Sequence, residues 1–222
     1  MVNMLFSLYN FHEDWAKDTV GKYINPEDKV VIIPFSFGNE ISNEEDFEYL
    51  YGKKGEWYNE IVNIFINFQI EEENIKWVNY YKDSKEKAKE LITNSDIIFL
   101  TWGFPEKMMA RLIEFDLVND IEKFKGVIMG SSAGAYVQFT EYHITPDADY
   151  DTFSYNLGLN IINDFGIEVH YEGTDIQNEH IKKVLKEKKE KIYAITNSGG
   201  IIADNGEIII LGDTEIFTRN NN

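Results

Sequence analysis

The chain has 222 residues, enough for one α/β domain with a substantial core, and 43% apolar and 14% aromatic residues exclude a disordered protein. A formal net charge of −18 repels phosphate backbones and argues against a nucleic-acid partner. The absence of cysteine excludes disulfides, thiolate metal sites and a cysteine nucleophile. No apolar run approaches the ~18 residues of a membrane-spanning helix, and the N-terminus has no basic region typical of a signal peptide. We therefore predict a cytoplasmic protein that does not bind membranes.

In the first part of the chain, apolar runs alternate with segments of helical spacing. The predicted strands are residues 4–9, 29–35, 75–81, 96–101 and 127–129. The predicted helices are residues 13–24, 56–68, 84–93 and 106–115, and the polar segment 36–55 is predicted as a loop with a short helix. This alternation indicates a mostly parallel sheet with helices on both faces, a three-layer α/β sandwich.

The last third of the chain has a different pattern. Residues 141–157 lack a clear period and are predicted as an irregular excursion. Residues 166–171 and 192–196 are predicted strands, Thr174 and Gln177 form a capping box for a helix through Lys186, and Asn205-Gly206 predicts a hairpin over 201–211. No linker interrupts the sequence, so we expect a single domain over residues 1–222 with a frayed tail at 220–222.

The segment after the predicted strand 127–129 carries the strongest chemical signal. It places glycine two residues before and two residues after Ser132, the pattern G-x-S-x-G. Between a buried strand and a helix, this pattern lifts a serine hydroxyl out of the sheet and points the next N–H, that of Ala133, toward a developing oxyanion. The adjacent Ser131 lacks glycine at both positions. The plainer interpretation is a tight strand-to-helix turn without catalytic function.

A serine nucleophile needs a base, and the chain has four histidines. His180 is expected on a solvated helix surface, and His12 in a turn. His143, in the irregular segment, and His170, at the end of a predicted strand, are the two candidates. The position at a strand end favours His170, because functional groups gather at the carboxyl ends of parallel strands.

Several sequence blocks resemble the S51 serine peptidases, the family of aspartyl dipeptidase and cyanophycinase. The string GSSAGA over residues 130–135 is similar to the family's nucleophile motif, and residues 96–105 look like its strand and Gly-Gly turn. His170, followed by an aromatic residue, looks like the family's histidine, and Asp147 lies where aspartyl dipeptidases carry the acid of their triad. The family fold resembles that of class I glutamine amidotransferases, with serine in place of cysteine.

The sequence departs from the family pattern at two places. Trp102 replaces the first glycine of the Gly-Gly turn, and Phe104 replaces the usual polar residue after it. A tryptophan keeps its backbone N–H, so an oxyanion hole can still form if the turn adopts a conformation that a non-glycine residue allows. Asp147 also has rivals as the acid of the triad: Asp149, Asp151, Glu168 and Glu172.

The resemblance implies a serine hydrolase that cleaves a peptide or amide bond in a small substrate. Ser132 would be the nucleophile, His170 the base and Asp147 the residue that orients it. The N–H groups of Ala133 and of Trp102 or Gly103 would bind the oxyanion. No metal or organic cofactor is implied, and a homodimer is compatible with the sequence. The alternatives are a catalytically inactive member of the same fold that binds a ligand, with Trp102 and Phe104 blocking the cleft, and an esterase.

The resemblance does not extend to the recognition of an acidic substrate. Aspartyl dipeptidases carry arginines after the histidine, whereas residues 171–183 contain three acidic residues and no arginine. The whole chain has only Arg111 and Arg219, and Lys182 or Lys183 would be a point charge without the arginine fork. We therefore predict a poor aspartyl dipeptidase that prefers a neutral or cationic substrate.

Overall fold

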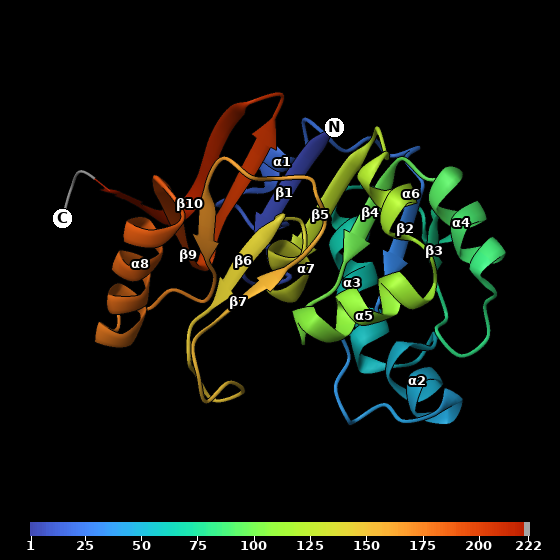
Figure 1. Ribbon diagram of the computed structural model, residues 1–222. Helices are drawn as coiled ribbons and strands as arrows, with labels where there is room; N and C mark the ends of the chain where they lie inside the picture. Colours follow the sequence, from blue (N-terminus) through green and yellow to red (C-terminus); the bar gives the residue numbers. More distant parts are fainter. Residues whose placement is uncertain (220–222) are drawn as a thin grey trace.

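The central sheet places the carboxyl ends of its parallel strands along one edge. The computed structural model describes residues 1–219 (Figure 1). Its eight-stranded sheet has the order β10-β9-β1-β5-β4-β2-β3, and β8 pairs with β9 off this path. Strands β1, β5, β4, β2 and β3 are parallel, while β9 is antiparallel to β1. The strands are β1 (Val2–Phe6), β2 (Val30–Ile33), β3 (Ile75–Trp77), β4 (Ile97–Leu100), β5 (Val127–Ser131), β8 (Gly166–Glu168), β9 (Lys191–Asp204) and β10 (Glu207–Thr218).

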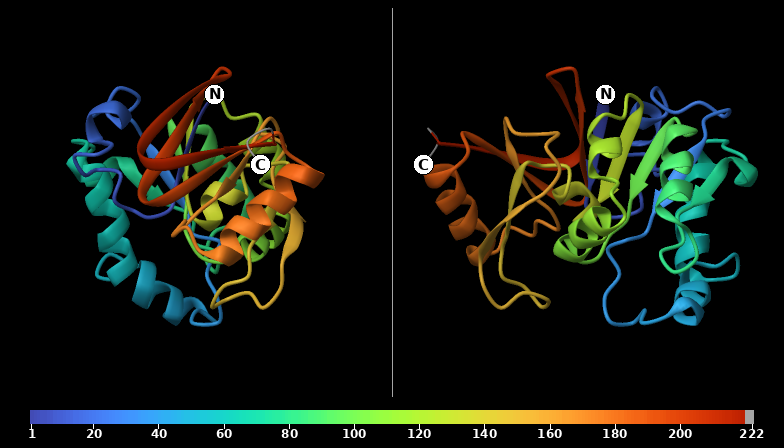
Figure 2. Two further views of the ribbon diagram at one scale, coloured as in Figure 1. Left: turned by 90° about the vertical axis from the view of Figure 1, so that its left-hand side faces the viewer. Right: turned by 45° about the vertical axis from the view of Figure 1, so that its right-hand side comes forward.

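Helices cover both faces of this sheet, as predicted for a three-layer α/β sandwich (Figures 1 and 2). Neighbouring residues of a strand point to opposite faces, so Ile32 packs with the cluster that includes α3 while Val31 packs with the cluster that includes α4 and α5. The helices are α1 (Lys17–Val20), α2 (Glu44–Tyr51), α3 (Glu56–Asn67), α4 (Lys85–Thr93), α5 (Pro105–Glu114), α6 (Val118–Glu122), α7 (Ala133–Tyr136) and α8 (Asp175–Glu187), with a 3-10 turn at Glu72–Asn74.

The C-terminal half contains more strand than the sequence predicts. The predicted strand 192–196 and hairpin 201–211 are parts of one long hairpin, β9 and β10, whose turn lies at Asn205-Gly206 as expected. The segment 141–157, predicted as irregular, contains the two-stranded sheet of β6 (Glu141–Ile144) and β7 (Ser154–Leu157). In both places pairing with the next strand along the chain extends or creates strands in segments that lack a clear apolar alternation, such as the polar middle of β9.

The element ends differ from the predictions where caps or turns intervene. The predicted helix 13–24 is reduced to α1 and flanking turns, and the predicted loop 36–55 contains α2, whose cap Asn43 accepts a hydrogen bond from Asp46 N. The predicted capping box of α8 is present, with Thr174 and Gln177 bonded reciprocally. The predicted strand 166–171 ends at Glu168. The predicted frayed tail, residues 220–222, lies outside the described residues.

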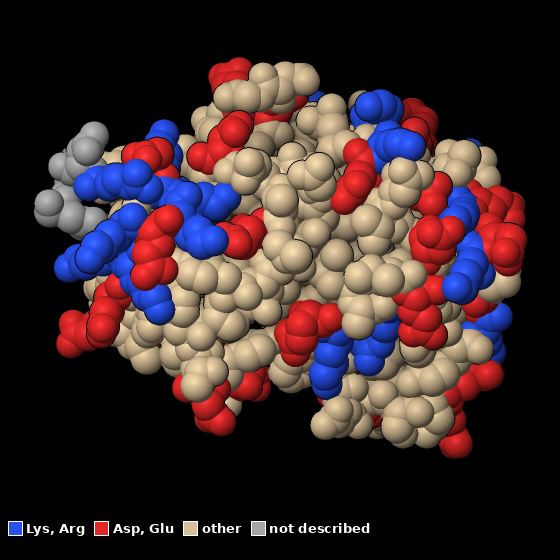
Figure 3. Space-filling view, viewed as in Figure 1, with Lys and Arg blue, Asp and Glu red and all other residues tan. Residues whose placement is uncertain are grey.

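Charge is unevenly distributed over the surface. On the face shown in Figure 3, Lys and Arg form their densest cluster over α8 and the neighbouring C-terminal end of the chain. The exposed lysines of α8 are Lys182, Lys183 and Lys186. No helix within residues 1–219 combines the length and the apolar character needed to cross a membrane.

Candidate active site

A cavity of about 490 Å³ lies beside the carboxyl ends of β4 and β5. It is lined by the turn after β5, the turn after β4, the segment that follows β6 and the segment between β8 and α8. Ser132, His170, Asp147 and Trp102, which the sequence analysis selected from four separate segments, all line this cavity. The tertiary structure therefore brings the candidate residues to one place.

Ser132 occupies a strained turn between β5 and α7. Its φ of 51° and ψ of −111° lie in a region that side chains rarely adopt, and its N–H donates to Phe6 O over 2.8 Å. The flanking glycines make this turn sterically feasible. A Cβ on Gly130 would lie 2.0 Å from Gly134 O, and a Cβ on Gly134 would lie 2.0 Å from Leu100 O. This is the geometry expected of a G-x-S-x-G turn that exposes its central hydroxyl.

The two adjacent serines point in different directions. Ser131 is fully buried, and its hydroxyl donates to Leu8 O over 3.0 Å. Ser132 is half-buried and lines the cavity. Within residues 1–219 its hydroxyl makes no hydrogen bond, to His170 or to any other group. Ser132 is thus the serine that a substrate could reach.

Three backbone N–H groups were predicted for an oxyanion hole, and two of them are free to serve. The N–H groups of Ala133 and Gly103 have no hydrogen-bond partner among residues 1–219. Trp102 N instead donates to the Tyr9 hydroxyl over 2.8 Å. Burial raises the pKa of Tyr9 well above its ordinary value, so this hydroxyl stays neutral. Gly103, with φ of 131°, takes the conformation that only glycine adopts easily, and this leaves Trp102 with an ordinary negative φ.

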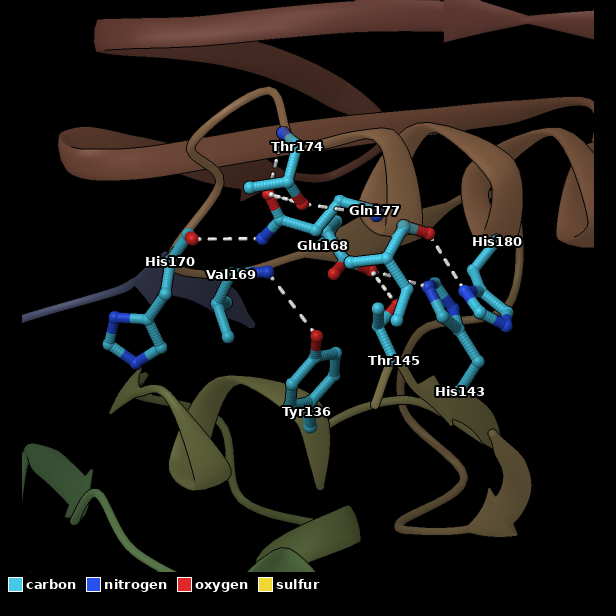
Figure 4. Close-up of polar contacts among 10 residues, drawn as sticks. Tyr136, His143, Thr145, Glu168, Val169, His170, Thr174, Gln177 and His180 are labelled. Carbon is cyan, nitrogen blue, oxygen red and sulfur yellow. Dashed lines mark hydrogen bonds and ion pairs between the residues drawn. The ribbon is translucent and has the colours of Figure 1, made fainter. Parts of the chain in front are cut away.

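His170 is held from both its backbone and its side chain. The chain turns sharply after β8, with φ of 51° at His170, and the His170 N–H donates to Ser7 Oγ over 2.9 Å. The imidazole Nδ1 lies 2.9 Å from Asn197 Oδ1. An amide oxygen can only accept, so this contact assigns the proton to Nδ1 and leaves the lone pair on Nε2. His170 is therefore in the tautomer that a general base requires. Figure 4 shows the imidazole turned away from the buried histidine His143.

Asn197 was not among the site residues predicted from the sequence. This exposed residue lies in the irregular middle of β9, where the register with β10 shifts between Gly212 and Thr214. Such irregularities redirect side chains from the regular alternation of a strand. The sequence does carry a signal: Asn197 directly follows the predicted strand 192–196, and position at a strand end is what selected His170.

Asp147 lines the cavity but makes its hydrogen bonds within its own turn. Its Oδ1 accepts from the N–H groups of Asp149 and Tyr150, over 2.8 and 3.0 Å. It has no hydrogen bond to His170 within residues 1–219. Among its rivals, Asp149, Glu168 and Glu172 also line the cavity, whereas Asp151 does not. The role of Asp147 as the orienting acid stays a prediction.

Glu168 and His143 form a buried polar pair next to the cavity (Figure 4). Both side chains are 3% exposed, and His143 Nε2 lies 2.7 Å from Glu168 Oε2. Thr145 Oγ1 donates to the same oxygen over 2.9 Å. His143 does not line the cavity, and its Nε2 is engaged by Glu168. These contacts favour His170 over His143 as the base.

The remaining histidines lie elsewhere. The Nδ1 of His180 bonds Ile176 O over 2.8 Å, and its ring stacks on Phe153. His12 lines a more open hollow of about 760 Å³ next to α3, which contains neither Ser132 nor His170.

The two aromatic residues of the Trp102 turn leave the cavity open. Trp102 is 37% exposed, packs on the Tyr9 ring and lines both the cavity beside Ser132 and the hollow beside α3. Phe104 does not line the cavity; it packs against Tyr150 with ring centroids 6.1 Å apart. Trp102 thus forms a wall of the site, and Phe104 packs outside the lining of the cavity.

Neither arginine reaches the cavity. Arg111 Nη1 donates to the carbonyl oxygens of Phe35 and Phe37, and Arg219 bonds the carbonyl oxygens of Leu185 and Lys189. Among residues 1–219, no three His, Asp or Glu side chains are grouped so that they could hold a metal ion.

Comparison with known proteins identifies a family and a fold. The family model of peptidase family S51 matches residues 51–211. The fold is similar to that of a putative peptidase E protein from Listeria monocytogenes EGD-e, at 17% identity and a TM-score of 0.67, covering 96% of this chain and 98% of the other. It is also similar to a peptidase from an acI-B1 Actinobacterium, at 18% identity and a TM-score of 0.63, covering 98% and 89%. No curated protein matches the sequence.

Proposed function

The chain belongs to peptidase family S51, and on that premise we propose that it is a serine hydrolase that cleaves a peptide or amide bond in a small substrate. One observation carries the proposal: Ser132, on a glycine-flanked strained turn, and His170, in the base tautomer, line the same cavity. A cavity of about 490 Å³ suits a ligand the size of a dipeptide.

In the proposed reaction, Ser132 Oγ attacks the substrate carbonyl while His170 Nε2 takes its proton. The oxyanion that forms accepts hydrogen bonds from the N–H groups of Ala133 and Gly103. His170 then gives the proton to the leaving amine, and a water molecule repeats the sequence to release the acyl group. Rotation of the Ser132 hydroxyl toward Nε2 is required, and the absence of a competing bond on that hydroxyl permits it.

Asn197 is the residue that we propose orients His170, because its Oδ1 is the hydrogen-bond partner of Nδ1. An amide fixes the tautomer and the plane of the ring as a carboxylate does, but it lends no negative charge to the imidazolium that forms during catalysis. Asp147 is the alternative, and it would have to leave its own turn to reach the ring.

Labelling with a fluorophosphonate, followed by mapping of the modified residue, tests the proposal. We expect label on Ser132, loss of labelling in Ser132→Ala without loss of folding, and retention of labelling in Ser131→Ala. Labelling that survives in Ser132→Ala would overturn the choice of nucleophile. A folded wild-type protein that takes no label would favour the inactive, ligand-binding alternative.

An esterase activity would use the same residues, so amide and ester substrates with a common acyl group need to be compared. Cytoplasmic location, a homodimer, a single domain and kinship with the glutamine amidotransferase fold stay predictions from the sequence.

A further inference from the structure

The catalytic cavity is lined by acidic groups. Of the described residues that line it, four are carboxylic acids and none is lysine or arginine. The four acids are Asp147, Asp149, Glu168 and Glu172. Both arginines bond backbone carbonyls elsewhere, and the lysines of α8 belong to its exposed face (Figure 3). A bound carboxylate would therefore meet like charge without a compensating cation.

Glu168 differs from the other three acids because its side chain is almost fully buried, at 3% exposure. Its Oε2 is engaged by His143 and Thr145. Its other carboxylate oxygen has no hydrogen-bond partner within residues 1–219, and Figure 4 shows this oxygen turned away from His143 and Thr145. Because Glu168 lines the cavity, this oxygen is available to a ligand. Hydrogen bonds to a carboxylate are stronger than those between neutral groups, so a ligand that brings a donor to this oxygen would be favoured.

The walls near Glu168 are apolar. Ile144, Pro146 and Val169 line the same cavity. An aliphatic stem can pack on such walls while its charged end reaches a carboxylate, as lysine and arginine side chains do at protein surfaces. A short acidic side chain would gain from neither feature.

We propose that Glu168 binds a positively charged group of the substrate, an ammonium or guanidinium, and that this enzyme selects cationic peptides or amides. The inference rests on the proposed function and deepens it. Asp147, Asp149 and Glu172 add negative potential at the cavity and attract the same substrates at low ionic strength. The charged group can be a side chain or the free α-amine, and the two sources require separate tests.

Matched substrates separate charge from size. Dipeptides with N-terminal lysine and norleucine differ in one charge at similar length, and Nα-acetylation of each removes the α-ammonium. We expect kcat/KM to be at least about tenfold higher for the lysine member if the side chain binds Glu168. If the α-amine binds there, acetylation causes the tenfold loss in both members. Equal kcat/KM for all four, or a preference for N-terminal aspartate, overturns the inference.

Glu168→Gln removes the charge and keeps the shape, so it should reduce the preference for the cationic member about tenfold or more. Glu45→Gln, at an exposed acid of α2 without ion-pair or hydrogen-bond partners among residues 1–219, is the matched control and should leave the preference unchanged. If Glu168→Gln does not fold, Glu172→Gln at the exposed rim replaces it, with a smaller loss of preference expected. A folded Glu168→Gln variant with an undiminished preference overturns the assignment.

Fluorophosphonate labelling of Ser132 distinguishes failure of the inference about charge from failure of the proposed function. If Ser132 takes the fluorophosphonate but cationic substrates are not preferred, the inference about charge fails and the proposed hydrolase stands. If Ser132 takes no label, the proposed function fails. In that case calorimetry with the uncleaved lysine and norleucine dipeptides tests the charge preference as binding, and equal affinities overturn it.

Discussion

The two halves of the candidate active site are built in different ways. The nucleophile half is contiguous in sequence, because the strained Ser132 turn depends on Gly130 and Gly134 two residues to either side. The base half is assembled from three distant segments. His170 bonds Ser7, 163 residues away, through its backbone, and Asn197, 27 residues away, through its ring.

This difference in construction has consequences for substitution. The turn is specified by its own glycines and by contacts with two neighbouring strands, at Leu100 O and Phe6 O, so it should respond most to changes within residues 130–134. The orientation of an imidazole at the end of a strand depends on every segment that contacts it. We therefore expect substitutions in the two halves to differ in their effects on activity and stability.

Replacement of the proposed base, His170, should be the most damaging change in the base half of the site. We expect His170→Ala to lower kcat/KM by about 10³-fold or more, because members of a catalytic triad act as a unit. His143→Ala is the control. It should mainly destabilise the fold, by about 3 kcal/mol in urea unfolding, since it leaves Glu168 buried without one partner. The reverse pattern, with a mild His170→Ala and an inactive but stable His143→Ala, would identify His143 as the base.

A methyl group added to the Ser132 turn should disrupt the nucleophile half of the site. In Gly134→Ala the new Cβ would meet Leu100 O at 2.0 Å, so the turn must shift. We expect a loss of about 2–3 kcal/mol in the free energy of unfolding, together with weaker Ser132 labelling. Gly206→Ala serves as a comparison for strain without a clash, because nothing lies within 4 Å of its Cβ, although its φ is 88°. Equal labelling by Gly134→Ala and wild type would show that the turn tolerates a side chain there.

Two substitutions of Asn197 test the base half of the site. Asn197→Ala should lower kcat by about 10- to 100-fold, because the ring of His170 loses its orienting partner. Asn197→Asp keeps the contact and adds a negative charge, which favours the protonated imidazole. Since the base acts when neutral, the acidic limb of the kcat/KM profile should move to higher pH, by about one unit. An unchanged profile and a fully active Asn197→Ala would exclude Asn197 from the site.

The acid nominated by the sequence should have the smallest effect. Because Asp147 bonds the N–H groups of its own turn, we expect Asp147→Asn to change kcat by less than about threefold. Asp151→Asn, at an acid outside the cavity, provides the reference. A loss of about 10²-fold or more in Asp147→Asn alone would return the orienting role to Asp147 and require the 145–151 segment to close over His170.

Features that are encoded by a few neighbouring residues could be predicted from the amino-acid sequence. The glycine spacing identified Ser132 rather than Ser131, the buried runs identified the parallel strands, and the pair Thr174 and Gln177 identified the start of α8. In each case the residues that carry the signal are close together in the sequence, so their pattern is visible in a single chain.

Which groups meet at the carboxyl ends of the parallel strands depends on the tertiary structure. The pairing of β9 with β10 joins 192–196 to the hairpin, and only the fold brings Asn197 to His170. Only the contact between the segment after β1 and the turn after β4 occupies the Trp102 N–H with Tyr9. Only the fold buries Glu168 with its partner His143 beside the cavity. These contacts depend on side chains that are remote in sequence and chemically unremarkable in their local context, so no local pattern specifies them.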